Sequence, residues 1–176
     1  MRKLILAMLL SVVGTSNTYA AKGDVLEGNI QQVIELPNLS KENIYSGSRQ
    51  WVATTFRDSQ SVIQMDDKAD GIIIGKGNFK YPCSGSWMCS AFQNDIVKFT
   101  VKIEAKDNKA RITFSDIRRY SPPTYNAGFK TPELELPVSN TTNRLDTVSQ
   151  VRDKFNMVII DYKNTVGASS QQNDNW

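Results

Sequence analysis

Strict alternation of apolar and polar side chains over residues 95–105 constrains the fold of this chain more than any other feature. Every second residue from Val97 to Ala105 is apolar, and the positions between them are Lys98, Thr100, Lys102 and Glu104. A period of two is that of a β-strand with one buried face and one face in water. The rest of the chain must therefore supply further strands and a layer that covers the apolar face.

A second alternating segment follows after the turn residues Asp107 and Asn108. Over residues 110–117 the apolar positions Ala110, Ile112 and Phe114 alternate with Arg111, Thr113 and Ser115. Two such segments joined by a short polar turn predict an antiparallel β-hairpin. Shorter apolar runs over residues 30–36, 61–65 and 72–81 predict three more strands.

Two amphipathic segments predict helices. Ser40 is a favourable N-cap, and Ile44, Ser48 and Trp51 then recur at helical spacing on one side. Residues 147–163 carry apolar side chains at intervals of three and four. We therefore expect a two-layer α+β domain: an antiparallel sheet of about five strands with two helices on one face, in the order β-α-β-β-β-β-α.

The segment from Gly71 to Gly77, GIIIGKG, superficially resembles a phosphate-binding loop. A P-loop places four residues between its first glycine and Gly-Lys and then a Ser or Thr, whereas this chain has three residues and then Gly77. We interpret it as part of a strand whose buried face includes Gly75 and Gly77. Their missing side chains leave room for close packing, with Trp51 or Phe56 as the expected filler.

The two ends predict export and a single domain. Arg2 and Lys3, an apolar run over residues 4–13 and small residues around Ala20 have the order of a cleaved signal peptide spanning residues 1–20. We expect one domain over residues 21–166, a long proline-rich surface connection over 121–144, and a disordered tail over 167–176. The mature protein is expected to be periplasmic or secreted, with no transmembrane segment.

The cysteines Cys83 and Cys89 lie six positions apart. In an oxidising compartment such a pair predicts one disulfide that closes a small loop, although a free buried pair remains the alternative. The chain has no histidine, so we expect no metal site, no cofactor and no ordinary catalytic triad. Trp87 lies inside the predicted loop, where it would form an apolar tip.

The order of elements also resembles a known family. The strand-helix opening, Trp51, the segment Ser61-Val62-Ile63-Gln64, Asp66 and the spaced glycines are similar to the core of an exported bacterial domain of unknown function, described as having a TATA-binding-protein-like fold. The resemblance covers about residues 30–162, without the Cys83–Cys89 insert and the proline-rich connection. It implies an architecture only, because that family has no assigned catalytic residues and fold does not imply function.

The polar face of the sheet is the main candidate for binding. By polar face we mean the outward side chains of the strands, and its basic members are Lys76, Lys80, Lys98, Lys102 and Arg111. Together with Trp87 they could contact an anionic ligand or a partner protein in the envelope. Nucleic acid is disfavoured because the mature chain is nearly neutral and the face has no apolar wedges.

These observations favour an exported, non-enzymatic binding module of unknown specific function. Lysines are also common on exposed sheet faces, where they discourage aggregation, so their presence alone does not define a site. Two alternatives stay open: a small extracytoplasmic hydrolase that uses acidic residues, and pairing with another strand at a sheet edge.

Overall fold

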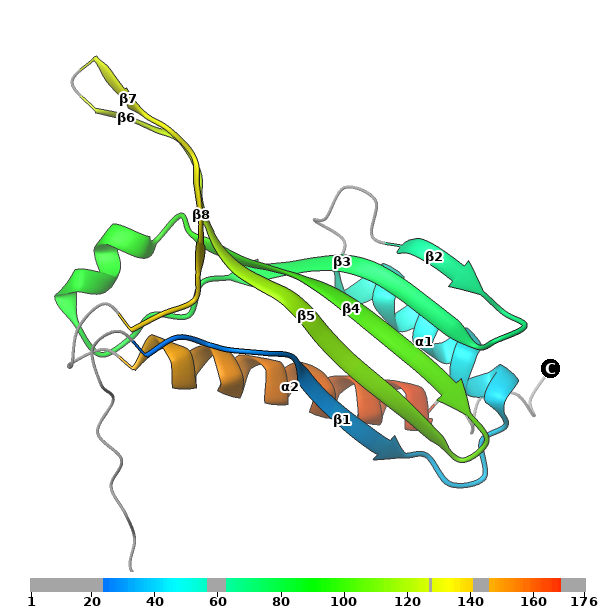
Figure 1. The fold of residues 1–176 in the computed structure, drawn as a ribbon. Helices are drawn as coiled ribbons and strands as arrows, with labels where there is room; N and C mark the ends of the chain where they lie inside the picture. Colours follow the sequence, from blue (N-terminus) through cyan, green and yellow to red (C-terminus); the bar gives the residue numbers. More distant parts are fainter. Residues whose placement is uncertain (1–23, 57–62, 127, 141–145, 169–176) are drawn as a thin grey trace, which may run out of the picture.

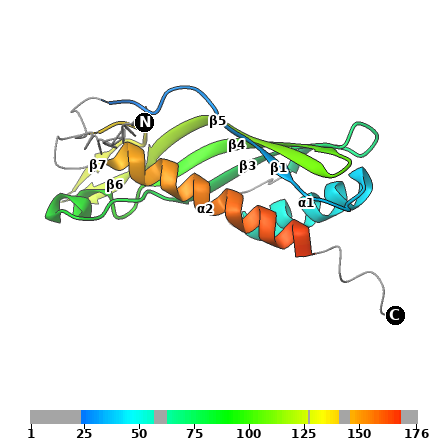
Figure 2. The same cartoon turned by 90° about the horizontal axis from the view of Figure 1, so that it is seen from below.

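The main part of the protein is a six-stranded antiparallel sheet with two helices on one of its faces (Figures 1 and 2). The computed structural model describes residues 24–56, 63–126, 128–140 and 146–168. The sheet has the order β1-β5-β4-β3-β2, and β8 pairs with the far end of β5. Its strands are β1 (Ile30–Glu35), β2 (Ile63–Asp67), β3 (Ile72–Lys80), β4 (Ile96–Lys106), β5 (Lys109–Ser121) and β8 (Leu134–Pro137).

The predicted α+β class, the antiparallel sheet and the placement of both helices are confirmed. Helices α1 (Lys41–Thr55) and α2 (Thr147–Ala168) lie on the same face of the sheet in Figure 2. The alternate apolar residues of β4 are buried on this side. The opposite face of the sheet carries no helix among the described residues. The polar side chains of β3, β4 and β5 are therefore left accessible to a ligand or partner.

Ser48 shows how a polar residue fits into the buried stripe of α1. Ser40 caps the helix by accepting a hydrogen bond from the Asn43 N–H (3.2 Å). Ser48 Oγ donates to the Ile44 carbonyl (2.6 Å) and lies 2.7 Å from the Tyr162 hydroxyl on α2. Burial raises the pKa of Tyr162 to about 12, so its hydroxyl stays neutral. The two helices are thus joined by a buried hydrogen bond.

Aromatic rings fill the space between the helices and the centre of the sheet. Phe155 of α2 is fully buried and lies against Phe79, Phe99 and Phe114, with ring centroids 5.1, 5.1 and 4.7 Å away. Trp51 of α1 packs edge-on against Tyr162, and its indole N–H donates to Asp161 Oδ2 (2.8 Å). These contacts fix α2 over β3, β4 and β5.

Gly77 of β3 makes room for aromatic side chains. A Cβ on Gly77 would lie 2.5 Å from Phe99 Cε2 and 3.2 Å from Phe56 Cδ1. Phe56 is therefore one filler of this space, as the sequence suggested, whereas Trp51 is not among the nearest contacts. The closest ring belongs to Phe99, the residue paired with Gly77 on the neighbouring strand.

A β-bulge in β5 shifts the alternation of inward and outward side chains by one residue. The register with β4 shifts between Lys98 and Thr100, and Asp116 on β5 has a positive φ of 52°. An extra residue in one strand reverses which side chains point inward. Beyond the bulge, Arg119 turns toward the core, where its Nε lies 3.4 Å from Asp95 Oδ2.

The segment after β5 differs from the predicted long connection. It contains β6 (Thr124–Asn126) and β7 (Phe129–Thr131), which form a separate two-stranded hairpin that projects from the sheet in Figure 1. It then returns as β8, which hydrogen-bonds to β5. Prolines and short strand lengths hid this pairing, because edge strands tolerate proline and carry little periodicity.

The boundaries of the last helix also need correction. The predicted helix over 147–163 continues to Ala168, so residues 167 and 168 belong to α2 and not to a tail. Three predicted segments lie outside the described residues: the signal peptide, the remaining tail residues 169–176, and the start of the strand expected over 61–65. Within the described part of the chain, no helix is long and apolar enough to cross a membrane.

Candidate functional site

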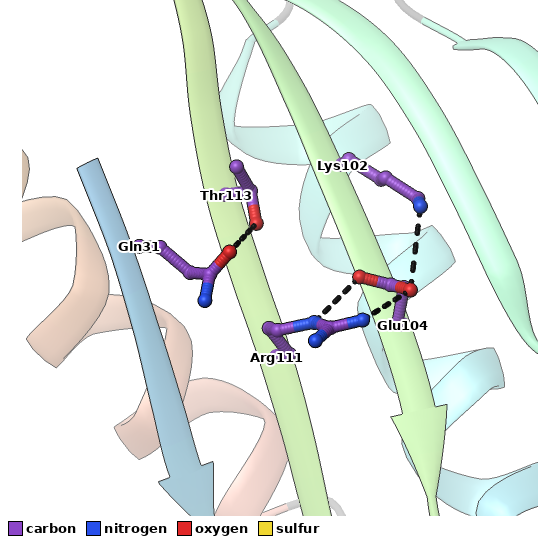
Figure 3. A network of polar contacts seen from close by, with 5 residues as sticks. All are labelled: Gln31, Lys102, Glu104, Arg111 and Thr113. Carbon is purple, nitrogen blue, oxygen red and sulfur yellow. Dashed lines mark hydrogen bonds and ion pairs between the residues drawn. The ribbon is translucent and has the colours of Figure 1, made fainter. Parts of the chain in front are cut away.

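Glu104 is the centre of the main polar network on the sheet (Figure 3). Its carboxylate accepts two hydrogen bonds from the Arg111 guanidinium, from Nε and Nη2, each at 2.7 Å. Lys102 Nζ lies 3.3 Å from the same carboxylate. Antiparallel pairing places Glu104 directly opposite Arg111, so the strand register itself creates this ion pair.

The bidentate pair fixes the charge states of both partners. Hydrogen bonds from Arg111 are the main reason that the pKa of Glu104 lies below its ordinary value, with Lys102 adding to the effect. The pKa of Arg111 is raised by the same contact. Two cations thus share one ionised carboxylate, and the cluster retains a net positive charge.

Lys76 belongs to a second network, centred on the bulge. Its ammonium group donates to Thr100 Oγ1 (2.8 Å), and that hydroxyl in turn donates to Asp116 Oδ2 (2.9 Å). The positive φ at Asp116 accompanies the bulge that directs this carboxylate toward Thr100. The sequence offered a signal for this bulge: the apolar residues Phe114 and Ile117 are three positions apart, which breaks the period of two.

Lys98 and Lys80 lie toward the other end of the strands. Lys98 Nζ lies 3.4 Å from the centroid of the Tyr120 ring and 3.8 Å from Glu135 Oε2 on β8. Lys80 is exposed, and no ion pair to it occurs among the described residues. Four of the five predicted basic contacts are therefore engaged within the protein.

The hairpin-end pocket is a concave part of the polar face. It has a volume of about 190 Å³ and is lined by Val33, Glu104, Lys106, Lys109, Ala110 and Arg111. Three cationic side chains and one carboxylate, already paired with Arg111, surround an apolar floor. Lys106 and Lys109 were not predicted as site residues, although their positions on either side of the turn at Asp107 and Asn108 could have suggested that they converge.

Trp87 and the disulfide form a separate feature. Cys83 and Cys89 are bridged, as predicted, and the loop between them contains the start of the short 3-10 helix η1 (Trp87–Phe92). The Trp87 side chain is 86% exposed. This loop connects the end of β3 to the start of β4, whereas Glu104 pairs with Ile72 at the opposite end of β3. The structure thus does not bring Trp87 together with the Glu104 cluster.

Three carboxyl groups are held in their ionised form by hydrogen bonds. Each described carboxyl group whose pKa departs clearly from its ordinary value is shifted downward, and the main causes are Arg49 for Asp66, Arg111 for Glu104 and the Ser149 backbone N–H for Asp146. Acid–base hydrolysis needs a carboxyl group with a raised pKa to donate a proton.

Among the described residues, no group of three His, Cys, Asp or Glu could hold a metal ion.

The pKa shift of Glu104 predicts a stability that depends on pH. A carboxyl group whose folded pKa is depressed stabilises the fold above its ordinary pKa of 4.5 and loses this contribution as the pH falls further. We therefore expect the melting temperature to decrease as the pH is lowered below about 4.5. Glu104→Gln removes the titrating group, so its melting temperature should fall less steeply over the same range. Equal slopes in thermal melts of the two proteins would contradict this assignment.

Comparisons with known proteins identify the same architecture. A family model described as a domain of unknown function (DUF4468) with TBP-like fold matches residues 31–120. The chain is similar to crystal structures of a DUF4468 family protein from Bacteroides ovatus ATCC 8483 and a TBP-like protein from Parabacteroides distasonis ATCC 8503. The sequence identities are 18% and 17%, and the TM-score is 0.51 for each. Both matches cover 78% of this chain, and they cover 90% of the Bacteroides ovatus chain and 93% of the Parabacteroides distasonis chain. No curated protein matches the chain.

Proposed function

Because the chain belongs to the DUF4468 family of domains of unknown function with a TBP-like fold, its fold assigns no activity, and we propose a function from the polar face itself. The protein is an exported, non-enzymatic binding module that holds an anionic ligand or an envelope partner at the hairpin-end pocket. The single observation that carries this proposal is the pocket, where Lys106, Lys109 and Arg111 surround one carboxylate that is already paired.

Charge and shape together favour an anionic group of modest size. Arg111 is oriented by its bidentate contact with Glu104, so its position is fixed before a ligand arrives. Lys106 and Lys109 face each other across the end of the hairpin, where each side chain is exposed and free to adjust. A carboxylate or phosphate group entering the pocket would meet both ammonium groups beside the apolar surface of Val33.

The export part of the proposal rests on the leader-like segment at residues 1–20 and the disulfide between Cys83 and Cys89. Disulfides persist in oxidising compartments such as the bacterial periplasm or the extracellular space. The apolar run follows two basic residues and precedes a small-residue cleavage site. Mass spectrometry of the protein purified from its cell envelope should find Ala21 as the first residue.

Titration with inorganic phosphate and with citrate, followed by backbone NMR, tests the pocket directly. We expect saturable shifts at the amides of Lys106, Lys109 and Arg111, with dissociation constants on the order of millimolar for such small probes. Lys106→Glu/Lys109→Glu should abolish the shifts, because it reverses two of the charges.

The matched control reverses two exposed lysines elsewhere. Lys68→Glu/Lys130→Glu makes the same change in net charge. Lys68 pairs with Glu42 on α1 and Lys130 lies on β7, so this variant should leave the shifts at the pocket intact. If both double variants reduce binding equally, general charge attraction explains the effect and the pocket assignment fails.

A further inference from the structure

A buried ion pair lies beneath the connection between β3 and β4. The side chains of Asp95 and Arg119 are only 7% and 13% exposed, and Asp95 Oδ2 lies 3.4 Å from Arg119 Nε. Ser121 Oγ donates a hydrogen bond to the same carboxylate oxygen (2.7 Å). The attraction between opposite charges is stronger where water is excluded, and it weakens when water enters. The state of this pair therefore depends on what covers it.

Phe92 of η1 covers the ion pair. The centroid of its ring lies 5.1 Å from Arg119 Cζ and 5.8 Å from the centroid of the Tyr81 ring. Phe92 is only partly buried against the core, and none of the residues of η1, all of which the structure describes, is fully buried. A segment with few buried apolar contacts opens more readily than the core of a protein. Burial alone thus holds η1 weakly over the ion pair.

The closed arrangement leaves two buried polar atoms without a hydrogen bond. Among the described residues, these atoms are the Tyr81 hydroxyl and Arg119 Nε. A buried donor that lacks an acceptor has lost its hydrogen bonds to water, and it regains them when water reaches it. Both groups therefore favour an open η1, and a further constraint must keep this helix closed.

The disulfide supplies that constraint. Cys83 lies just beyond the end of β3, where the Tyr81 N–H donates to the Asp95 carbonyl (2.9 Å), and its partner Cys89 lies on η1. Residues three apart in a 3-10 helix lie on the same side, so Cys89 and Phe92 share one side of η1. The bond ties this side to the end of β3. It also lowers the entropy that the chain would gain on opening.

A second attachment of the same loop is weaker. The Ser84 N–H and Oγ both donate to Gln150 Oε1 on α2, at 3.0 and 3.2 Å. These groups are exposed, and water competes for the same hydrogen bonds, so each bond contributes little to the closed state. The covalent bond is therefore the main tie between this loop and the rest of the fold.

We propose that the Cys83–Cys89 disulfide is a redox-sensitive latch that keeps η1 closed over the Asp95–Arg119 pair. When the bond is reduced, η1 opens and water enters around the ion pair. The sheet and α2 stay packed, because the rings that surround Phe155 come from β3, β4 and β5 and not from η1. The exposure of this end of the molecule is thus set by the oxidation state of two cysteines.

The reductant that opens the latch is a dithiol. Cys83 and Cys89 are both partly exposed, so it can reach either sulfur. One thiolate of the dithiol attacks a sulfur and forms a mixed disulfide, and its second thiolate then displaces the protein sulfur from this bond. Two electrons pass to the cysteines, which take up two protons as thiols, and the reductant leaves as a disulfide.

Hydrogen exchange followed by mass spectrometry, on the oxidised protein and after reduction with dithiothreitol, tests the latch. Amides of residues 84–94 should exchange at least about tenfold faster in the reduced protein, whereas those of residues 97–105 in β4 should not change. Cys83→Ser/Cys89→Ser should show the fast exchange without reductant and should not respond to dithiothreitol. Equal exchange in both oxidation states, or faster exchange throughout β4, would overturn the proposal.

Tyr81→Phe tests whether unsatisfied polar groups drive the opening. It keeps the ring but removes the buried hydroxyl, so in the reduced protein residues 84–94 should exchange about fivefold more slowly than in the reduced wild type. Tyr125→Phe is the matched control: Tyr125 is 73% exposed on β6, so its loss of a hydroxyl should leave exchange unchanged. A reduced Tyr81→Phe protein that exchanges as fast as the reduced wild type would refute this driving force.

Discussion

Phe155→Ala is expected to lower the free energy of unfolding by about 4 kcal/mol, within the range found for removing a buried phenylalanine. Phe155 is fully buried on α2, and its ring contacts those of Phe79, Phe99 and Phe114 on three neighbouring strands. Removing the ring leaves a cavity between the layers, and the surrounding rings belong to strands that cannot collapse into it. A loss of this size is a large part of the stability of a small domain.

The same substitution on the surface provides the control. Phe129 on β7 is 79% exposed, so Phe129→Ala should change the free energy of unfolding by no more than about 0.5 kcal/mol. Urea denaturation followed by tryptophan fluorescence measures both. A Phe155→Ala protein as stable as the Phe129→Ala protein would mean that α2 does not pack over the sheet as described.

The layers of the fold could be predicted because periodicity reports burial directly. The alternation between Val97 and Ala105 defined a strand with one wet face, and the structure has β4 there with that division. The spacing of Ile44, Ser48 and Trp51 likewise defined the buried side of α1. These signals are local, and each residue reports on its own environment.

The candidate site depends on relations between strands, which periodicity does not reveal. Glu104 and Arg111 were both placed on the polar face, but their bidentate contact follows from the register of β4 against β5. The bulge at Asp116 changes the direction of every later side chain in β5, so Arg119 lies in the core beside Asp95. The predicted alternation ended before this point, although the spacing of Phe114 and Ile117 marks the bulge and a period of two continued from Ile117 would have placed Arg119 inward.

The ion pairs change how the basic residues are interpreted. Of the five predicted basic residues, four are engaged within the protein: Lys102 and Arg111 share Glu104, Lys76 donates to Thr100, and Lys98 lies against Tyr120. An engaged cation loses part of its attraction for a ligand because its field is already compensated. At the hairpin end, Lys106 and Lys109 lie beside Arg111, and Glu35 of β1 is paired opposite Lys109.

Gly77→Ala is expected to cost about 2–3 kcal/mol, although alanine adds only one carbon atom. The new Cβ would lie 2.5 Å from Cε2 and 2.7 Å from Cζ of Phe99. A ring at the end of a free side chain could swing away, but Phe99 is held by Phe56, Phe79, Phe114 and Phe155. The clash must therefore be relieved by moving β3 away from β4 or by disturbing the whole cluster.

A double-mutant cycle assigns this cost to the ring. Leucine lacks the two ring atoms that clash, so in a Phe99→Leu background the step from Gly77 to alanine should cost less than about 1 kcal/mol. Gly167→Ala is the control for adding a Cβ. Among the described residues the new atom meets only Leu36, at an ordinary 3.7 Å, and Gly167 lies in a helix, so the change should be neutral or slightly stabilising. If Gly77→Ala costs the same in both backgrounds, the backbone of β3 and not the Phe99 ring requires the glycine.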